Sequence, residues 1–189
     1  MVTDYQGADI HDPKTYKIKK ETDPVIFNMP SNGLAFFGSH VWVDGQIDSA
    51  ELTIVAASLG SSNDENIYIN DDILYTNKDG TDVIGLVAEG DISIGLYSSN
   101  DLEIDAALLA KNGRVGRDYY TESQSNAFFK RDSILVYGSI ATNQRYGFAW
   151  TDGAGYQIRD IYFDNNLLYT PPPYFPTGNV YELDLWEDL

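Results

Sequence analysis

The sequence predicts an all-β chain, wound as a single parallel β-helix (β-solenoid) with a capping segment at each end. Three observations predict this: a short phrase that recurs, continuous runs of small apolar residues, and little helical periodicity. The chain is also rich in tyrosine, with 14 Tyr beside 8 Phe and 3 Trp, and aromatic residues favour strands. The best helical segment, 105–112, also fits a strand, so almost no helix is expected.

The recurring phrase consists of an apolar triplet, a short polar or small bend, and a second strand that begins with a β-branched residue. A bend of two or three residues suits a corner better than the full reversal of an antiparallel sandwich, which is the alternative fold. Repeats of about 20 residues are typical of chains that stack on themselves. The copies are 35–43, 67–75, 86–94 and 134–142, with a degenerate fifth copy at Val115.

Aligning the copies makes four β-branched residues equivalent, namely Val41, Ile73, Ile92 and Ile140. The bends before them are then expected to lie along one edge of the molecule. These bends are Ser39-His40, Asp71-Asp72, Gly90-Asp91 and Gly138-Ser139.

A length of 189 residues fits one domain with three parts. Residues 1–32 are a lead-in that caps one end, with a short strand at 25–27. Residues 33–148 form the solenoid, in which the runs 86–88 and 106–110 have the continuous apolar character of buried parallel strands. Residues 149–189 form an aromatic and proline-rich cap, because proline removes backbone donors and cannot template another strand.

The composition excludes several classes of function. The formal net charge of −17 disfavours nucleic acid, which is bound through Lys and Arg, and anionic membranes. The absence of cysteine excludes disulfides, thiolate nucleophiles and cysteine-ligated zinc. No segment has the length of apolar sequence that spans a bilayer, and the first residues lack a signal-peptide pattern. The chain is therefore either cytoplasmic or preceded by an export or anchor segment.

A series of short motifs runs through residues 33–189. In order they are Val41-Trp42-Val43-Asp44-Gly45, Ala107-Leu108-Leu109-Ala110, Tyr137-Gly138-Ser139-Ile140, Gly155-Tyr156 with Arg159, Tyr162, Asp164 and Leu167, then Pro171 to Pro176, and Trp186-Glu187.

Together these motifs resemble a family of bacterial surface proteins described as pilus-assembly PilX-like. Full-length members of that family begin with a pilin-like hydrophobic helix that anchors or polymerises the protein. The resemblance implies a β-solenoid that is exported and displayed at the cell surface, with the anchor or export segment upstream of residue 1. It implies partners among surface or pilus subunits, and no catalytic residues.

Acidic residues form two candidate sites. Asp71-Asp72 and Glu89-Gly90-Asp91 would stack if their corners were equivalent, and stacked carboxylates can bind Ca²⁺. Polysaccharide lyases on β-helices use such an arrangement with a basic residue, for which Lys78 or Arg114 would have to serve. Asp101, Glu103 and Asp105 alternate along one strand, the spacing of a glycosidase carboxylate pair. The structural interpretation of both groups, which we favour, is turn formation and an outward strand face with Leu102 and Ile104 pointing inward.

The two histidines, His11 and His40, are too few for a rich metal site, and His40 occupies a corner position. The segment 113–120, which leads into the polar loop 116–129, contains the most promising binding patch, because two arginines and two tyrosines can bind a sugar or peptide by stacking and hydrogen bonding. Its residues are Arg114, Arg117, Tyr119 and Tyr120. The insertion at 58–65 is the second loop that could bind a ligand.

These observations predict a non-enzymatic structural or adhesive β-solenoid of the cell surface. It would be a component of a pilus-like or other filamentous assembly, able to self-associate, with a carbohydrate or surface ligand and no cofactor other than Ca²⁺. Two alternatives remain: a carbohydrate-active lyase or hydrolase on the same scaffold, and a cytoplasmic scaffold that polymerises through its ends.

Overall fold

A computed structural model describes residues 1–7, 14–60 and 64–176. This part of the chain is nearly all β, as expected, and its one helix is a short 3-10 turn, η1 (Asn165–Leu168). The strands are β1 (Val2–Tyr5), β2 (Ile18–Glu21), β3 (Leu34–Phe37), β4 (Val41–Trp42), β5 (Gly45–Ile47), β6 (Glu51–Ala56), β7 (Ile67–Ile69), β8 (Ile73–Tyr75), β9 (Val83–Ala88), β10 (Ile92–Ile94), β11 (Asp101–Ala110), β12 (Val115–Arg117), β13 (Lys130–Thr142) and β14 (Gly155–Phe163).

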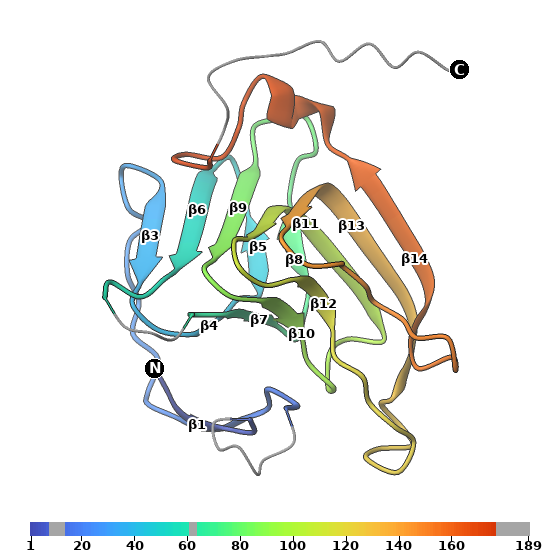
Figure 1. Cartoon of the computed structure of the whole chain (residues 1–189). Helices are drawn as coiled ribbons and strands as arrows, with labels where there is room; N and C mark the ends of the chain where they lie inside the picture. The colour runs from blue at the N-terminus through green and yellow to red at the C-terminus, as the bar shows by residue number, and fades with distance from the viewer. Residues whose placement is uncertain (8–13, 61–63, 177–189) are drawn as a thin grey trace, which may run out of the picture.

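Two parallel sheets contain every strand from β3 onwards. The larger has eight strands, with β14-β13-β11-β9-β6-β3 in order and β5 and β8 attached, and the smaller has the order β12-β10-β7-β4. The chain crosses repeatedly from the larger sheet to the smaller one and back, and each sheet adds its strands side by side in chain order (Figure 1). Parallel pairing requires such crossovers, and the predicted preference for parallel over antiparallel pairing is confirmed in both sheets.

The pairing register corrects the alignment of the repeats. Val41 pairs with Ile67, Ile67 with Ile92, and Ile92 with Val115, so the expected fifth copy at Val115 is real. The predicted equivalence of Ile73 and Ile140 with Val41 is wrong, because Ile73 pairs with Gly45 and Ile104, whereas Ile140 pairs with Leu108.

The four bends therefore do not lie along one edge. Ser39-His40 and Gly90-Asp91 share one corner, Asp71-Asp72 forms another between β7 and β8, and Gly138-Ser139 lies within the long strand β13. The sequence phrase matched the first three places because an apolar triplet, a bend and another triplet occur wherever two short strands meet at a corner. The fourth match lies within the continuous strand β13 and is not a corner.

The core lies between the two sheets. Paired positions on neighbouring strands carry similar buried side chains, as Ile67, Ile92 and Val115 do in the smaller sheet and Leu86 and Leu108 in the larger one. Removing such aliphatic side chains from water stabilises the fold by about 1.5–3 kcal/mol each. The runs 86–88 and 106–110 are largely buried parallel strands, as their continuous apolar sequence predicts.

A polar ladder runs along the corner that precedes the smaller sheet. Nδ1 of His40 accepts a hydrogen bond from the backbone N–H of Asn66 at 3.0 Å. Oδ1 of Asn66 accepts from the N–H of Asp91 at 2.7 Å, and Oδ1 of Asp91 accepts from the N–H of Arg114 at 2.7 Å. Each side chain thus satisfies a backbone donor of the next strand, at the point where the bend interrupts regular pairing.

Glycines make room for this ladder. A Cβ atom at Gly90 would clash with Oδ1 of Asn66, and one at Gly113 would clash with Oδ1 of Asp91. Gly90 and Gly113 precede the paired residues Asp91 and Arg114. The glycines at these corners therefore allow neighbouring strands to approach each other closely.

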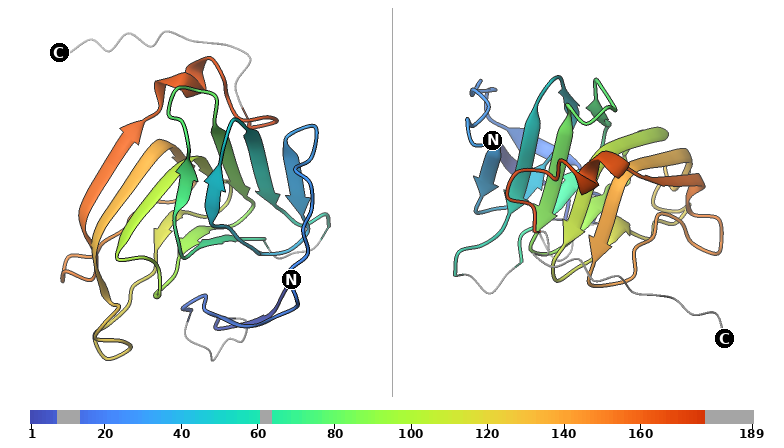
Figure 2. Two further views of the ribbon diagram at one scale, coloured as in Figure 1. Left: turned by 180° about the vertical axis from the view of Figure 1, so that it is seen from behind. Right: turned by 90° about the horizontal axis from the view of Figure 1, so that it is seen from above.

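The terminal segments lie on the flanks of the sheets. The antiparallel pair β1–β2 contacts the smaller sheet through a ring cluster in which Tyr16 stacks on Tyr68 with centroids 4.2 Å apart. At the other terminus, Pro172 and Phe175 lie against Gly85 of β9, and Thr53 of β6 donates a hydrogen bond to the Pro173 carbonyl. The segment that follows β14 crosses the ends of the strands of the larger sheet (Figure 2). The short strand predicted at 25–27 is not formed, and these residues are exposed.

The ladder predicts a difference between two variants of one residue. Asp91→Ala removes the acceptor for the Arg114 N–H and should lower the free energy of unfolding by about 1–3 kcal/mol. Asp91→Asn keeps an oxygen acceptor of the same shape and should retain most of that stability. Urea unfolding of both variants measures the difference, and equal losses would contradict a role for the acceptor oxygen.

Candidate functional site

The four residues predicted as a binding patch lie at β12 and at the start of the loop that follows it, and the structure divides them into two pairs. Arg117 is fully buried and Tyr120 nearly so, whereas Arg114 is half-buried and Tyr119 exposed. The loop projects from the end of the molecule that contains β12 and β13 (Figure 1). Only Arg114 and Tyr119 can therefore present much of their side chains to a ligand.

Arg117 anchors the loop from inside. Its guanidinium donates to the backbone carbonyls of Phe128 at 2.7 Å, Leu96 at 3.1 Å and Phe129 at 3.2 Å. It also lies over the Tyr120 ring, 4.7 Å from the centroid. Burial lowers the pKa of Arg117 to about 10, which leaves it charged at neutral pH, so its role is to hold the loop against the sheet.

Arg114 and Tyr119 meet at the exposed indole of Trp150. The Arg114 guanidinium lies 5.9 Å from the Trp150 ring centroid and forms a 2.7 Å ion pair with Asp118. The Tyr119 ring packs edge-on to Trp150 at 5.2 Å, and its hydroxyl donates to Asp152 at 2.6 Å. That hydrogen bond raises the pKa of Tyr119 and lowers that of Asp152.

Two hollows open beside Trp150, and it lines both. One has a volume of about 310 Å³ and the other of about 450 Å³. The first combines Arg114, Tyr119 and Tyr120 with Trp150, so an aromatic surface and a cation face the same space. Such a surface suits a flat, hydroxyl-rich ligand that stacks on the indole and hydrogen-bonds to the arginine.

The sequence did not identify Trp150 or Asp152 as part of this patch, because they lie in the segment predicted to be a cap. The signal that could have found them is the turn Trp150-Thr151-Asp152-Gly153, which combines an exposed aromatic residue with a polar turn. This turn is far from the loop along the chain, so the contact between them cannot be predicted from a local sequence pattern.

The acidic residues considered for Ca²⁺ lie at separate corners. Asp71 accepts a hydrogen bond from the Ser99 hydroxyl at 2.6 Å, and Asp72 accepts from the Glu103 N–H at 2.9 Å. Asp91 belongs to the ladder, and Glu89 accepts from the Ser58 N–H at 2.9 Å. The prediction that the two acidic groups stack on each other is therefore wrong. Within residues 1–7, 14–60 and 64–176, no group of three or more His, Asp or Glu side chains is placed to hold a metal ion.

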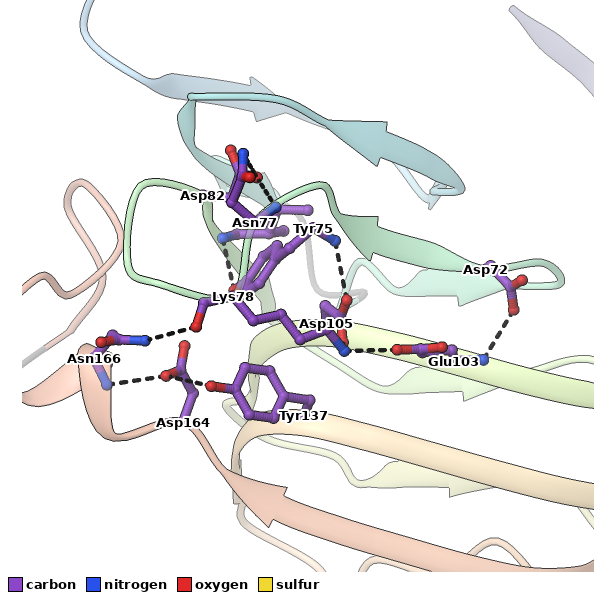
Figure 3. Close-up of polar contacts among 11 residues, drawn as sticks. Asp72, Tyr75, Asn77, Lys78, Asp82, Glu103, Asp105, Tyr137, Asp164 and Asn166 are labelled. Carbon is purple, nitrogen blue, oxygen red and sulfur yellow. Dashed lines mark hydrogen bonds and ion pairs between the residues drawn. The ribbon is translucent and has the colours of Figure 1, made fainter.

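Lys78 joins the second acidic group. Its ammonium lies 2.6 Å from Oε1 of Glu103 and 2.7 Å from Oδ1 of Asp105, while Oδ2 of Asp105 accepts from the Tyr75 N–H at 3.0 Å (Figure 3). Burial opposes protonation of Lys78, but the hydrogen bonds to the two carboxylates outweigh it and raise its pKa. Burial likewise raises the pKa of Asp105, against the opposing effect of Lys78.

The cluster continues across the neighbouring strands. Lys78 lies 4.8 Å from the Tyr137 ring centroid, and the Tyr137 hydroxyl donates to Asp164 at 3.0 Å (Figure 3). Asp164 also accepts from the backbone of Asn166, at the start of η1. These contacts link β11, β13 and η1 to the turn after β8, which is an arrangement that fastens adjacent strands together.

The strand that carries the predicted glycosidase pair is only partly as expected. Leu102 and Ile104 point inward, as predicted. Asp101 is exposed and accepts from Ser133 at 2.6 Å, whereas Asp105 is fully buried rather than part of an outward solvated face. Glu103 and Asp105 share one ammonium group, so both carboxylates already have a cationic partner.

Comparison of the chain with family models, curated proteins and solved structures finds no match. None of the helical structure in the described residues is long and apolar enough to cross a membrane.

His40 begins the polar ladder, while His11 lies outside the described residues. Nδ1 of His40 lies 3.0 Å from the Asn66 nitrogen and 2.9 Å from Oε2 of Glu65. The neutral ring accepts from Asn66 at this nitrogen, and a protonated one can only donate to Glu65. Burial lowers the pKa of His40 more than Glu65 raises it, which favours the neutral, accepting form.

A pH dependence follows from this shift. The unfolded chain binds a proton at His40 more readily than the folded chain does. The contribution of His40 to the free energy of unfolding is therefore complete above the ordinary histidine pKa of about 6.5 and is lost as the pH falls below that value. His40→Asn keeps an acceptor but cannot titrate, so its stability should fall less between pH 8 and pH 6. Urea midpoints of the two proteins across that range test this. Parallel curves would contradict it.

Proposed function

We propose that this chain forms a closed parallel β-solenoid that serves as a non-enzymatic structural and adhesive element of the cell surface, within a pilus-like filament. The observation that carries the proposal is the constant register of the parallel ladders. Val41, Ile67, Ile92 and Val115 pair in series in one sheet, and the larger sheet adds its strands in the same chain order. Such nearest-neighbour stacking supports a stiff rod-like body.

The polar corners favour a structural role for the acidic residues. Asp72, Asp91 and Asp105 each accept a hydrogen bond from a backbone N–H of a neighbouring strand. These carboxylates accept hydrogen bonds from backbone N–H groups that would otherwise lack a partner. A rigid body assembled in this way can carry loops that bind a ligand.

The surface around Trp150 supports the adhesive part of the proposal. An exposed indole flanked by Tyr119 and by the Arg114 cation offers stacking and directed hydrogen bonding on one face. Carbohydrate is the ligand class that uses both, since a sugar ring has apolar C–H faces and hydroxyl groups at its rim. Arg114 adds a preference for sugars that carry a carboxylate.

Display at the cell surface rests on the resemblance to the PilX-like family and stays a proposal. The acidic net charge of −17 is compatible with a solvated, crowded surface and with repulsion from anionic lipid. A carbohydrate-active enzyme on the same scaffold remains the alternative from the sequence. Release of new reducing ends or unsaturated products from uronate-rich polysaccharides, with or without Ca²⁺, would establish that alternative.

The proposal predicts which residues bind the ligand and which hold the loop. Trp150→Ala should weaken binding to a responsive polysaccharide roughly tenfold, because one aromatic stacking contact is worth about 1–1.5 kcal/mol. Arg114→Ala should act in the same direction without unfolding the protein. Titration calorimetry against acidic and neutral polysaccharides provides the measurement.

Tyr169→Ala is the matched control for aromatic removal, because Tyr169 is 86% exposed and lines neither hollow. It should leave the affinity unchanged. Antibody labelling of intact cells that express the full-length gene tests surface display. Labelling that appears only after lysis would contradict the proposal.

A further inference from the structure

The N-terminal segment forms part of the 310 Å³ hollow beside Trp150. Lys14, which is exposed and precedes β2, lines this hollow together with Arg114 and Trp150. Three segments that are far apart in the sequence therefore build it: the N-terminal segment, the chain around β12, and the turn that begins at Trp150. The N-terminal segment with β1 lies beneath the smaller sheet in Figure 1.

Hydrogen bonds hold residues 14–16 from two sides. On the side of the smaller sheet, the Tyr16 carbonyl accepts from Nε1 of Trp42 at 2.9 Å and from Nδ2 of Asn70 at 3.2 Å. On the side of the loop, the Tyr120 hydroxyl donates to the Lys14 carbonyl at 2.7 Å. These contacts fix the backbone of Lys14 against the wall of the hollow.

A second set of hydrogen bonds connects the N-terminal segment to the arginine. The hydroxyl of the buried Tyr16 donates to Oδ2 of Asp118 at 2.6 Å, and Nη2 of Arg114 donates to Oδ1 of the same carboxylate at 2.7 Å. Burial, together with Asp118, raises the pKa of Tyr16, so the hydroxyl remains a donor at neutral pH. Nη2 of Arg114 also donates to the Arg117 carbonyl at 3.3 Å. Both bonds of Arg114 use Nη2, so the N–H groups of Nη1 and Nε are available to a ligand.

The charge at this hollow is opposite to that of the whole chain. The chain has a formal net charge of −17, whereas the hollow is lined by two cations, Lys14 and Arg114, and by the carboxylate of Asp118. Both oxygens of Asp118 already accept hydrogen bonds. Within the described part of the chain, no carboxylate forms an ion pair with Lys14. A local excess of positive charge on an acidic protein attracts an anionic ligand.

We propose that the N-terminal segment completes a site for a uronic acid residue of a polysaccharide, whose carboxylate is bound by Lys14 and Arg114 while its ring stacks on Trp150. In a uronic acid the carboxylate is attached directly to the sugar ring, so a ring on the indole keeps its charge within the hollow. The inference rests on the proposed function and names its ligand class and a further binding residue, Lys14.

A pair of polymers with the same backbone tests the proposal. The wild type should bind polygalacturonate at least fivefold more tightly than the same polymer after chemical reduction of its carboxylates to alcohols. Lys14→Ala should weaken binding of polygalacturonate roughly threefold to fivefold, as expected for an ion pair at a partly exposed site, and should leave binding of the reduced polymer unchanged. Titration calorimetry measures both affinities, and added salt should weaken only the binding of the charged polymer.

Two variants separate the role of Lys14 in the hollow from a general effect of charge. Lys17→Ala removes the same charge from the same segment, but Lys17 lies over the Tyr97 ring and does not line the hollow, so its affinities should match those of the wild type. Lys14→Arg keeps the cation and should retain tight binding of polygalacturonate. Circular dichroism melting checks that each variant is folded.

Equal affinities of the wild type for the two polymers would overturn the proposal, as would a Lys17→Ala variant that loses as much affinity as Lys14→Ala. If Trp150→Ala still weakens binding in either case, the proposed carbohydrate-binding function stands and only the uronate site is lost. A wild type that binds neither polymer would overturn the uronate site and the adhesive function together.

Discussion

The rest of the structure depends on how the corners satisfy their backbone N–H groups. A parallel ladder pairs its own donors, but a bend between two short strands leaves donors without a partner in the same ladder. His40, Asn66 and Asp91 solve this in series, each accepting a hydrogen bond from the next strand along. Because an unpaired buried donor costs about 1–3 kcal/mol, this ladder determines which residues can occupy a corner.

The same requirement accounts for several of the acidic residues. Carboxylates offer acceptors only, and Asp72, Asp82 and Asp105 all accept from the backbone of neighbouring strands. Lys78 offsets the resulting repulsion at one position by binding Glu103 and Asp105 together. The acidic charge is in this respect partly a consequence of how the strands are joined.

Three arginines lie around the loop and Trp150. Arg117 is buried beneath the loop that it anchors, and Arg114 and Arg159 border the two hollows beside Trp150. This arrangement places an adaptable loop on a rigid base, which is how binding surfaces are commonly positioned. It also makes one end of the molecule chemically different from the other.

The residue pattern was enough to predict the β content, the parallel preference, the inward direction of Leu102 and Ile104, and the position of the projecting loop. These follow from local rules: side chains alternate along a strand, and small apolar runs are buried. The folded chain was needed to show that Ile67 rather than Ile73 matches Val41, that Arg117 and Tyr120 face inward, and that Trp150 joins Arg114 and Tyr119. The physical reason is that register and loop contacts are set by hydrogen bonds between strands distant in sequence, which a local pattern repeated at every corner cannot distinguish.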